Sequence, residues 1–235
     1  LFYDSGSFGT QSPGEFATTT PSSPVNVETN KPISTTTGYT ISGAESGNYY
    51  LNQPVLSADI TPAPLTIAAD TGQNKVYGSD DPTNLIYTFE GLVNNETEAV
   101  LDTSVSIARA QGEDAGLYAI TVSEATAMNY DITFDNSIDF TITPKELTVT
   151  AISDTKEYGG TEPTLTYSID GLVNGDTEAS LDTAVSISRA AGEAVDTYTI
   201  TPSAAADSNY TVSFVTADFT ITPKELTVTA ISDTK

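Results

Sequence analysis

The chain has 235 residues with 32 acidic and eight basic side chains, a formal net charge of −24, and neither cysteine nor histidine. It therefore contains no thiol nucleophile, disulfide, Cys/His zinc site or serine–histidine pair. Its negative charge repels nucleic-acid phosphates and anionic membranes, and no apolar run approaches the roughly 20 residues of a membrane span. We expect no nucleic-acid partner and no direct membrane insertion.

Residues 1–60 resemble the closing part of a repeat that recurs later in the chain. The segment Gly38–Pro62 aligns with Leu117–Pro144 through a tyrosine, an Asn-Tyr pair and a closing Ile-Thr-Pro. We predict a partial β domain over residues 1–60. The alternative is that residues 1–30, which are rich in Ser, Thr and Pro, form a disordered leader.

Two complete repeats follow, over residues 61–142 and 143–221. The stretch GLVNNETEAVLDTSVSIARA at Gly91–Ala110 reappears as GLVNGDTEASLDTAVSISRA at Gly171–Ala190. Self-similarity at a fixed spacing is the signature of a repeat protein, so we predict two β domains of about 80 residues each.

A further repeat begins at residue 222. The sequence ITPKELTVTAISDTK occurs at Ile142–Lys156 and again at Ile221–Lys235. Residues 222–235 are therefore expected to be the first strand of another copy. Because both ends of the sequence fall inside repeats, we expect the chain to be a segment of a longer protein.

Alternation of apolar residues with Thr or Ser predicts short strands with one buried and one solvent-facing side. Turns with Gly or Asn separate these runs. The segment Asp176–Leu181 has a helical pattern, with Asp176 or Thr177 as N-cap and Glu178 in its first turn, and predicts one or two turns. In the second repeat the strands are expected at 147–152, 164–169, 185–187, 197–201, 210–214 and 219–221.

The segment Glu113–Ile120 resembles the tyrosine corner of immunoglobulin-type sandwiches, with Tyr118 as the corner residue and Ile120 where a cysteine would stand. The second copy keeps Tyr198 and Ile200. We predict an all-β fold of tandem small β-sandwich (immunoglobulin-like) domains with one short helical turn each. A β-grasp-like arrangement, with that turn lying on one sheet, is the alternative.

Prolines mark the junctions between repeats. Pro62 and Pro64 stand at the first junction and Pro144 at the second. Proline fixes its own φ and holds the preceding residue in an extended conformation. We expect neighbouring repeats to form a semi-rigid array; ordinary boundaries with free hinge motion are the alternative.

Paired carboxylates can hydrolyse glycosides without histidine or cysteine. In the next repeat Asp80-Asp81 becomes Thr161-Glu162, and Asp114 becomes Ala194, which is typical of a solvated surface. We therefore expect no catalytic residue and no enzyme activity. The candidates considered are Asp80, Asp81, Glu96, Glu98, Glu113 and Asp114.

Two equivalent loops carry oxygen ligands of the kind that Ca²⁺ prefers. They hold Asn94, Asn95 and Glu96 in one repeat, and Asn174 and Asp176 in the next. No EF-hand or similar spacing is present, so we assign no metal-ligating residue. Ca²⁺ is the one cofactor considered, and a merely charged, hydrated surface is the alternative.

Tyrosines could stack on sugars. Tyr49 and Tyr50 are candidates in the first segment, and Tyr130 and Tyr210 recur in the Asn-Tyr pairs of the two repeats. Recurrence in every repeat favours a core or corner role for the last two.

The order and spacing of these motifs resemble the MBG domain of bacterial surface proteins, in its YGX type. Val76-Tyr77-Gly78 and Glu157-Tyr158-Gly159 carry the naming motif, and GLVN, Asn-Tyr and FTITP follow in order in both repeats. Residues 15–62, with ISGAESGNYY at Ile41–Tyr50, resemble the closing part of the companion YDG domain. The resemblance implies tandem modules of large secreted adhesins similar to filamentous haemagglutinin, with no catalytic residues to carry over.

From these features we expect a structural stalk or adhesion segment of a long extracellular bacterial surface protein or fibre. Its partners would be neighbouring repeats of the same chain. Two alternatives stay open: a module that binds glycans or other cells, and a subunit of a polymeric extracellular filament.

Overall fold

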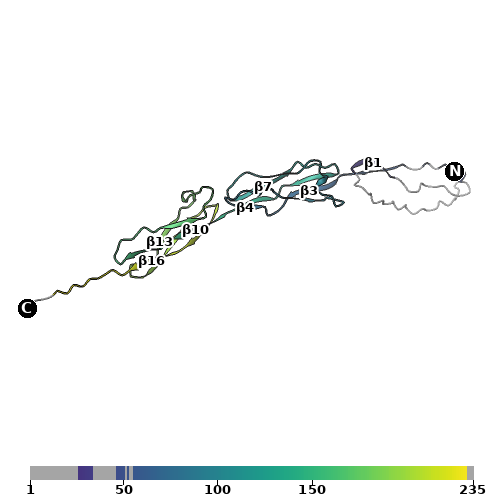
Figure 1. The fold of residues 1–235 in the computed structure, drawn as a ribbon. Helices are drawn as coiled ribbons and strands as arrows, with labels where there is room; N and C mark the ends of the chain where they lie inside the picture. The colour runs from purple at the N-terminus through teal and green to yellow at the C-terminus, as the bar shows by residue number, and fades with distance from the viewer. Residues whose placement is uncertain (1–25, 34–45, 51, 53–54, 232–235) are drawn as a thin grey trace, which may run out of the picture. The chain divides into compact units, whose positions relative to one another are not determined.

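The computed structural model describes residues 26–33, 46–50, 52 and 55–231, and within these ranges the fold is all-β (Figure 1). This confirms the predicted fold class. The chain divides into two compact units, Leu1–Ala68 with Thr88–Ser106 and Val122–Asp135, and Ala69–Tyr87 with Ile107–Thr121 and Asn136–Lys235. The second repeat therefore lies wholly within the second unit.

The second repeat contains two sheets. The first has three strands in the order β12-β10-β15, and the other has four in the order β11-β16-β14-β13. Antiparallel pairs join β10 to β12, β13 to β14 and β14 to β16. The strands are β10 (Lys145–Ala151), β11 (Asp154–Glu157), β12 (Tyr167–Asp170), β13 (Ser186–Arg189), β14 (Thr197–Ser203), β15 (Tyr210–Val215) and β16 (Ala217–Thr222).

The strands that begin this repeat lie beside the strands that end it. β10 runs parallel to β15, with Lys145 opposite Tyr210. β11 runs parallel to β16, with Glu157 opposite Thr222. Each sheet thus contains one parallel pair, between one of the first two strands of the repeat and one of the last two.

Alternation along the strands produces the core of the second repeat. Leu147 and Val149 of β10 are fully buried, and so is Phe219 of β16. Ala151 of β10 shares one cluster with Ile200 and Phe219 of the four-stranded sheet, so the inner faces of the two sheets meet. Each large apolar side chain buried in this way contributes about 1.5–3 kcal/mol relative to an exposed one.

The first repeat has the same elements. Its two sheets have the orders β5-β3-β8 and β4-β9-β7-β6. β3 again runs parallel to β8, and β4 parallel to β9. The strands are β3 (Ala63–Ala69), β4 (Asn74–Val76), β5 (Tyr87–Glu90), β6 (Ser106–Arg109), β7 (Gly116–Ser123), β8 (Tyr130–Asp135) and β9 (Asp139–Thr143).

Before the repeats, β1 (Glu28–Ile33) pairs antiparallel with β2 (Leu56–Ile60), and Ser46–Asn48 form the 3₁₀ turn η1. Most of the predicted partial domain over 1–60, including much of its YDG-like motif, lies outside the described residues.

The predicted tyrosine corner is present in both repeats. The Tyr118 hydroxyl donates to the Asp114 carbonyl at 2.8 Å, and the Tyr198 hydroxyl donates to the Ala194 carbonyl at 3.0 Å. Each bond returns to the backbone four residues upstream and fixes the loop that leads into β7 or β14.

The short helix is a single 3₁₀ turn in each repeat, η2 (Glu98–Val100) and η3 (Glu178–Ser180). Thr177 is its N-cap position, and the Thr177 amide donates to Ser180 Oγ at 3.1 Å. Asp176 is not the cap, because its carboxylate is taken by tyrosines. The strand expected over 164–169 begins only at Tyr167, and β11 was not predicted.

Candidate functional site

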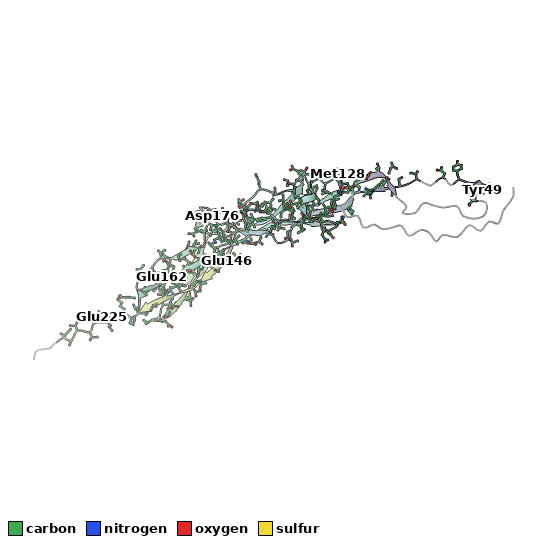
Figure 2. All side chains as sticks on the ribbon, turned by 45° about the vertical axis from the view of Figure 1, so that its right-hand side comes forward. Tyr49, Met128, Glu146, Glu162, Asp176 and Glu225 are labelled. Atoms are coloured by element: carbon green, nitrogen blue, oxygen red, sulfur yellow. The ribbon has the colours of Figure 1, made fainter. Side chains whose placement is uncertain are left out.

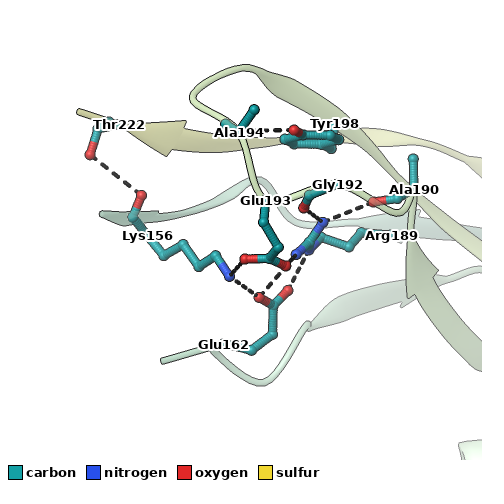
Figure 3. Close-up of polar contacts among 9 residues, drawn as sticks. All are labelled: Lys156, Glu162, Arg189, Ala190, Gly192, Glu193, Ala194, Tyr198 and Thr222. Carbon is teal, nitrogen blue, oxygen red and sulfur yellow. Dashed lines mark hydrogen bonds and ion pairs between the residues drawn. The ribbon is translucent and has the colours of Figure 1, made fainter. Parts of the chain in front are cut away.

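Four charged side chains of the second repeat meet in one cluster (Figure 3). Lys156 of β11 lies 2.6 Å from both Glu162 and Glu193. Arg189 of β13 also pairs with both carboxylates, at 2.7 Å for Glu193. The third guanidinium nitrogen, Nη1, donates to the carbonyls of Ala190 and Gly192. We call this set the ion cluster of the second repeat.

The ion cluster closes the end of the hydrophobic core. Strand register places Lys156 opposite Ile221 and Arg189 opposite Ile200, which puts both cations on the inner face of the four-stranded sheet. The Arg189 guanidinium carbon lies 4.8 Å from the centre of the Phe219 ring, a cation–π distance. The side chains of Lys156 and Arg189 are only 6 % and 10 % exposed, whereas their carboxylate partners face solvent.

This arrangement perturbs the carboxylates. The pKa of Glu162 falls to about 2, first because Arg189 donates to it and then because Lys156 does. The pKa of Glu193 is lowered by hydrogen bonds from Lys156 and from Arg189. Both carboxylates are therefore charged in the folded chain at any pH near neutrality, and their role is to neutralise two nearly buried cations.

The first repeat has the same ion cluster, made of Lys75, Asp81, Arg109 and Glu113. Asp81 accepts from Lys75 at 2.8 Å and from Arg109 at 2.7 Å. Hydrogen bonds from Arg109 and then Lys75 lower the pKa of Asp81 to about 2. The Arg109 guanidinium lies 5.3 Å from the Phe140 ring centre.

A second recurring arrangement lies within the second compact unit and joins residues of successive repeats. The Tyr77 hydroxyl donates to Asp176 Oδ2 at 3.0 Å, and the Tyr210 hydroxyl donates to the same oxygen at 2.7 Å. The two rings meet edge to face, 5.4 Å apart. Asp176, labelled in Figure 2, thus links a tyrosine of one repeat to a tyrosine of the next.

Gly78 permits this approach. Its φ is +78°, a region that favours glycine, and a Cβ built there would lie 2.3 Å from a methyl carbon of Val173. Tyr77 and Gly78 therefore pack against the loop of the second repeat that carries Val173 and Asp176, and the absence of a side chain at Gly78 makes the close approach possible.

Asn209 makes a second link. Its Oδ1 accepts from the Ala115 amide at 2.7 Å, and its Nδ2 donates to Asp114 at 3.3 Å. We use the term repeat junction for Tyr77, Gly78, Asp114 and Ala115 together with their partners Val173, Asp176, Asn209 and Tyr210.

Burial and hydrogen bonding act together on the junction tyrosines. Burial, followed by the hydrogen bond to Asp176, raises the pKa of Tyr210 to about 12. For Tyr77, a hydrogen bond with Asn174 lowers the pKa, but burial and Asp176 outweigh it, so the net pKa is raised. Both hydroxyls therefore stay protonated and act as donors to Asp176.

The equivalent side chains of the first repeat make corresponding hydrogen bonds within the first compact unit. Tyr130 donates to Glu96, the counterpart of Asp176. Asn129 Oδ1 accepts from the Val27 amide at 2.9 Å, as Asn209 accepts from Ala115. The recurring Asn-Tyr pair thus has two functions: the tyrosine is buried and the asparagine holds the preceding segment.

The sequence candidates are distributed as follows. Asp81 and Glu113 belong to the ion cluster, and Glu96 bonds to Tyr130. Tyr130 and Tyr210 are each 6 % exposed, which confirms their expected core role. Tyr49 (Figure 2) and Tyr50 are 70 % and 92 % exposed. Among the residues that the structure describes, no group of three or more His, Cys, Asp or Glu side chains is placed to hold a metal ion.

Sequence reasoning missed the ion clusters, although a signal was present. The chain has only two arginines, and Arg109 and Arg189 stand at equivalent positions. Lys75 and Lys156 are likewise equivalent, and so are the carboxylates at 81 and 162. A basic residue that recurs in so acidic a chain indicates a fixed ion pair.

Three features characterise these repeats: parallel pairing of early with late strands, an ion cluster over the core, and hydrogen bonds between successive repeats. Together they define a class of tandem all-β repeat modules. The MBG domain (YGX type) family matches residues 65–141 and 147–220, and the chain belongs to this family. Comparison with curated proteins finds no match. MBG domains occur in secreted surface proteins, and the described part of the chain contains no helix with the length and apolarity to cross a membrane.

Proposed function

We propose that this chain is a tension-bearing structural segment of a long extracellular bacterial surface protein, without catalytic activity. The observation that carries the proposal is the parallel pairing of the strands that begin and end each repeat. In the second repeat, β10 lies beside β15 and β11 beside β16. In the first, β3 lies beside β8 and β4 beside β9.

This pairing has a mechanical consequence. In a chain of repeats, tension reaches β11 from its N-terminal side, through β10, and reaches β16 from its C-terminal side. Because the two strands are parallel, these forces pull them past each other in opposite directions. The hydrogen bonds between the strands cross the direction of pull, so all of them resist together. Unzipping an antiparallel pair from one end would instead load its bonds one after another.

The ion clusters and junctions support the same role. The chain has no disulfide, so its cores and strand pairs supply the resistance to unfolding. An ion cluster covers the core beside each parallel pair, with Lys156 in β11 and Thr222 Oγ1 bonded to the Lys156 carbonyl at 3.4 Å. We propose that the bonded junctions and prolines keep neighbouring repeats semi-rigid.

Single-molecule pulling tests the proposal. Because the chain lacks cysteine, introduced pairs provide unique handles. Glu146→Cys with Thr222→Cys pulls the second repeat from its two ends. Ser186→Cys with Ser203→Cys is the matched control, because these exposed residues lie opposite each other at one end of the β13–β14 pair.

End-to-end pulling should require roughly twofold more force or greater than the control, since a sheared pair breaks its bonds together. Equal or lower force from the end handles would contradict the proposed function. Loss of folding in either variant is detected by circular dichroism before pulling.

A glycan-binding role is the second candidate, favoured by the exposed rings of Tyr49 and Tyr50. Aromatic side chains present a flat apolar face with a polar tip, which suits sugar stacking. Glycan-array binding by the chain that is lost in the double variant Tyr49→Ala/Tyr50→Ala would support it. No binding by the unaltered chain would remove it.

A further inference from the structure

Two equivalent tyrosines of the repeats differ sharply in exposure. Tyr77 is 7 % exposed because the second repeat covers it, whereas Tyr158 is 53 % exposed. Their backbones are held alike: the Tyr77 amide donates to Thr143 and the Tyr158 amide to Thr222, each at 2.8 Å. Tyr158 is thus positioned as Tyr77 is, but its ring has no partner among the described residues.

Across the described ranges, the residues near Tyr158 also lack the contacts that their counterparts near Tyr77 make. Gly159 has φ +73°, close to that of Gly78, but a Cβ there would meet nothing within 4 Å. Val195 is the counterpart of Ala115, and its amide has no hydrogen-bond acceptor in the described part of the chain. Tyr158, Gly159 and Val195 form what we call the distal face of the second repeat.

The segment after β16 carries the sequence of a core strand. Leu226 and Val228 stand in the same fifteen-residue sequence as Leu147 and Val149 of β10. Leu147 and Val149 are fully buried, yet Leu226 and Val228 are 85 % and 86 % exposed. Burial of this segment requires partner strands equivalent to β12 and β15.

We propose that the distal face is a docking surface for a further MBG-type repeat, whose first strand would include Leu226 and Val228. The Tyr158 ring would lie edge to face on that repeat's Asn-Tyr tyrosine, and its hydroxyl would donate to the carboxylate equivalent to Asp176. The asparagine would accept from the Val195 amide. The inference rests on the repeat junction, and it deepens the proposed structural function by naming the partner of this surface.

The observations favour this occupant over a second copy of the chain. The distal face has the backbone geometry of the established junction, and its predicted partner begins in the residues that follow directly. In the two complete repeats of a second copy, the asparagine of each Asn-Tyr pair is already bonded, to Val27 or to Ala115.

An extended chain tests the proposal. Because residues 222–235 repeat residues 143–156, adding a copy of residues 157–222 after Lys235 completes a third repeat. Amide hydrogen exchange is then compared between the 235-residue chain and the extended chain. The Val195 amide should exchange about fivefold to tenfold more slowly in the extended chain, as for one added hydrogen bond. The Ala115 amide, already bonded, is the internal control.

A variant keeps the test independent of the fold of the added repeat. Gly159→Ala should leave Val195 exchange unchanged in the 235-residue chain and restore fast exchange in the extended chain. Equal exchange of Val195 in both chains, with the third repeat folded by circular dichroism, would overturn the proposal. Protection of Val195 that already rises with concentration in the 235-residue chain would also overturn it, because a second copy would then be the occupant. Neither outcome depends on the pulling forces that test the proposed function.

Discussion

Tyr77 and Asp176 belong to successive repeats and meet through a hydrogen bond of 3.0 Å, on the same carboxylate oxygen that accepts from Tyr210. One carboxylate therefore serves both the core of its own repeat and the contact with the preceding one. This double use couples the stability of a repeat to the presence of its neighbour, as expected for repeat proteins whose stability includes nearest-neighbour terms.

Gly78→Ala should destabilise the chain more than Gly159→Ala. Both glycines have positive φ, so alanine costs each about 1–2 kcal/mol of backbone strain. Only at Gly78 does the new methyl group also clash with Val173, which adds about 1–3 kcal/mol of overpacking. Urea unfolding of the two variants measures the difference. If the junction is formed in solution, Val173→Ala should partly rescue Gly78→Ala.

Asp176→Asn should lower the free energy of unfolding by about 2 kcal/mol or more, because hydrogen bonds to a charged group contribute about 1.5–3 kcal/mol. Glu96→Gln is the matched control, since Glu96 accepts from Tyr130 without a tyrosine of a preceding repeat. Tyr77→Phe in each background completes a double-mutant cycle. Equal effects of Tyr77→Phe with and without Asp176 would contradict coupling between the two residues.

Stability should decrease in acid through the ion clusters. Asp81 and Glu162 have folded pKa values of about 2, below the roughly 4 of unfolded chains. Their contribution is present above about pH 4 and is lost as the pH falls toward 2. Urea midpoints between these pH values measure the loss, and the double variant Asp81→Asn/Glu162→Gln should show a flatter dependence. An unchanged slope in that variant would show that the clusters do not stabilise the fold.

Stability should also decrease in alkali through Tyr210. Its folded pKa of about 12 lies above the unfolded value of about 10, so the unfolded chain loses this proton first. The contribution is complete below pH 10 and is lost as the pH rises toward 12. Tyrosinate absorbance and circular dichroism, followed together, measure it. Tyr210→Phe should remove this part of the alkaline dependence, whereas Tyr158→Phe, at an exposed position, should not.

The sequence predicted most strands because alternating apolar residues define a buried face wherever a strand is half-covered. The tyrosine corner at Tyr118 was predictable for the same reason: a local motif makes a local bond. β11 escaped prediction because Asp154–Glu157 contains no apolar residue; its inward side chain is Lys156, neutralised by the ion cluster.

The ion clusters and the repeat junction could not be derived from local patterns. Lys156 and Arg189 stand on the two edge strands of one sheet, β11 and β13, and are joined only through Glu162 and Glu193, which lie between strands in the sequence. Likewise, Tyr77 and Asp176 lie far apart in sequence and meet only through the contact of two repeats. The Tyr-Gly pair could be noted as a family motif, but its partners required the structure.

Pulling both repeats in series tests the account most directly. A chain with handles at Ser57→Cys and Thr222→Cys should show two abrupt ruptures of similar force, each lengthening the chain by the residues of one repeat. Smooth extension without discrete ruptures, at forces no higher than those that unzip the β13–β14 pair, would contradict a role in bearing tension.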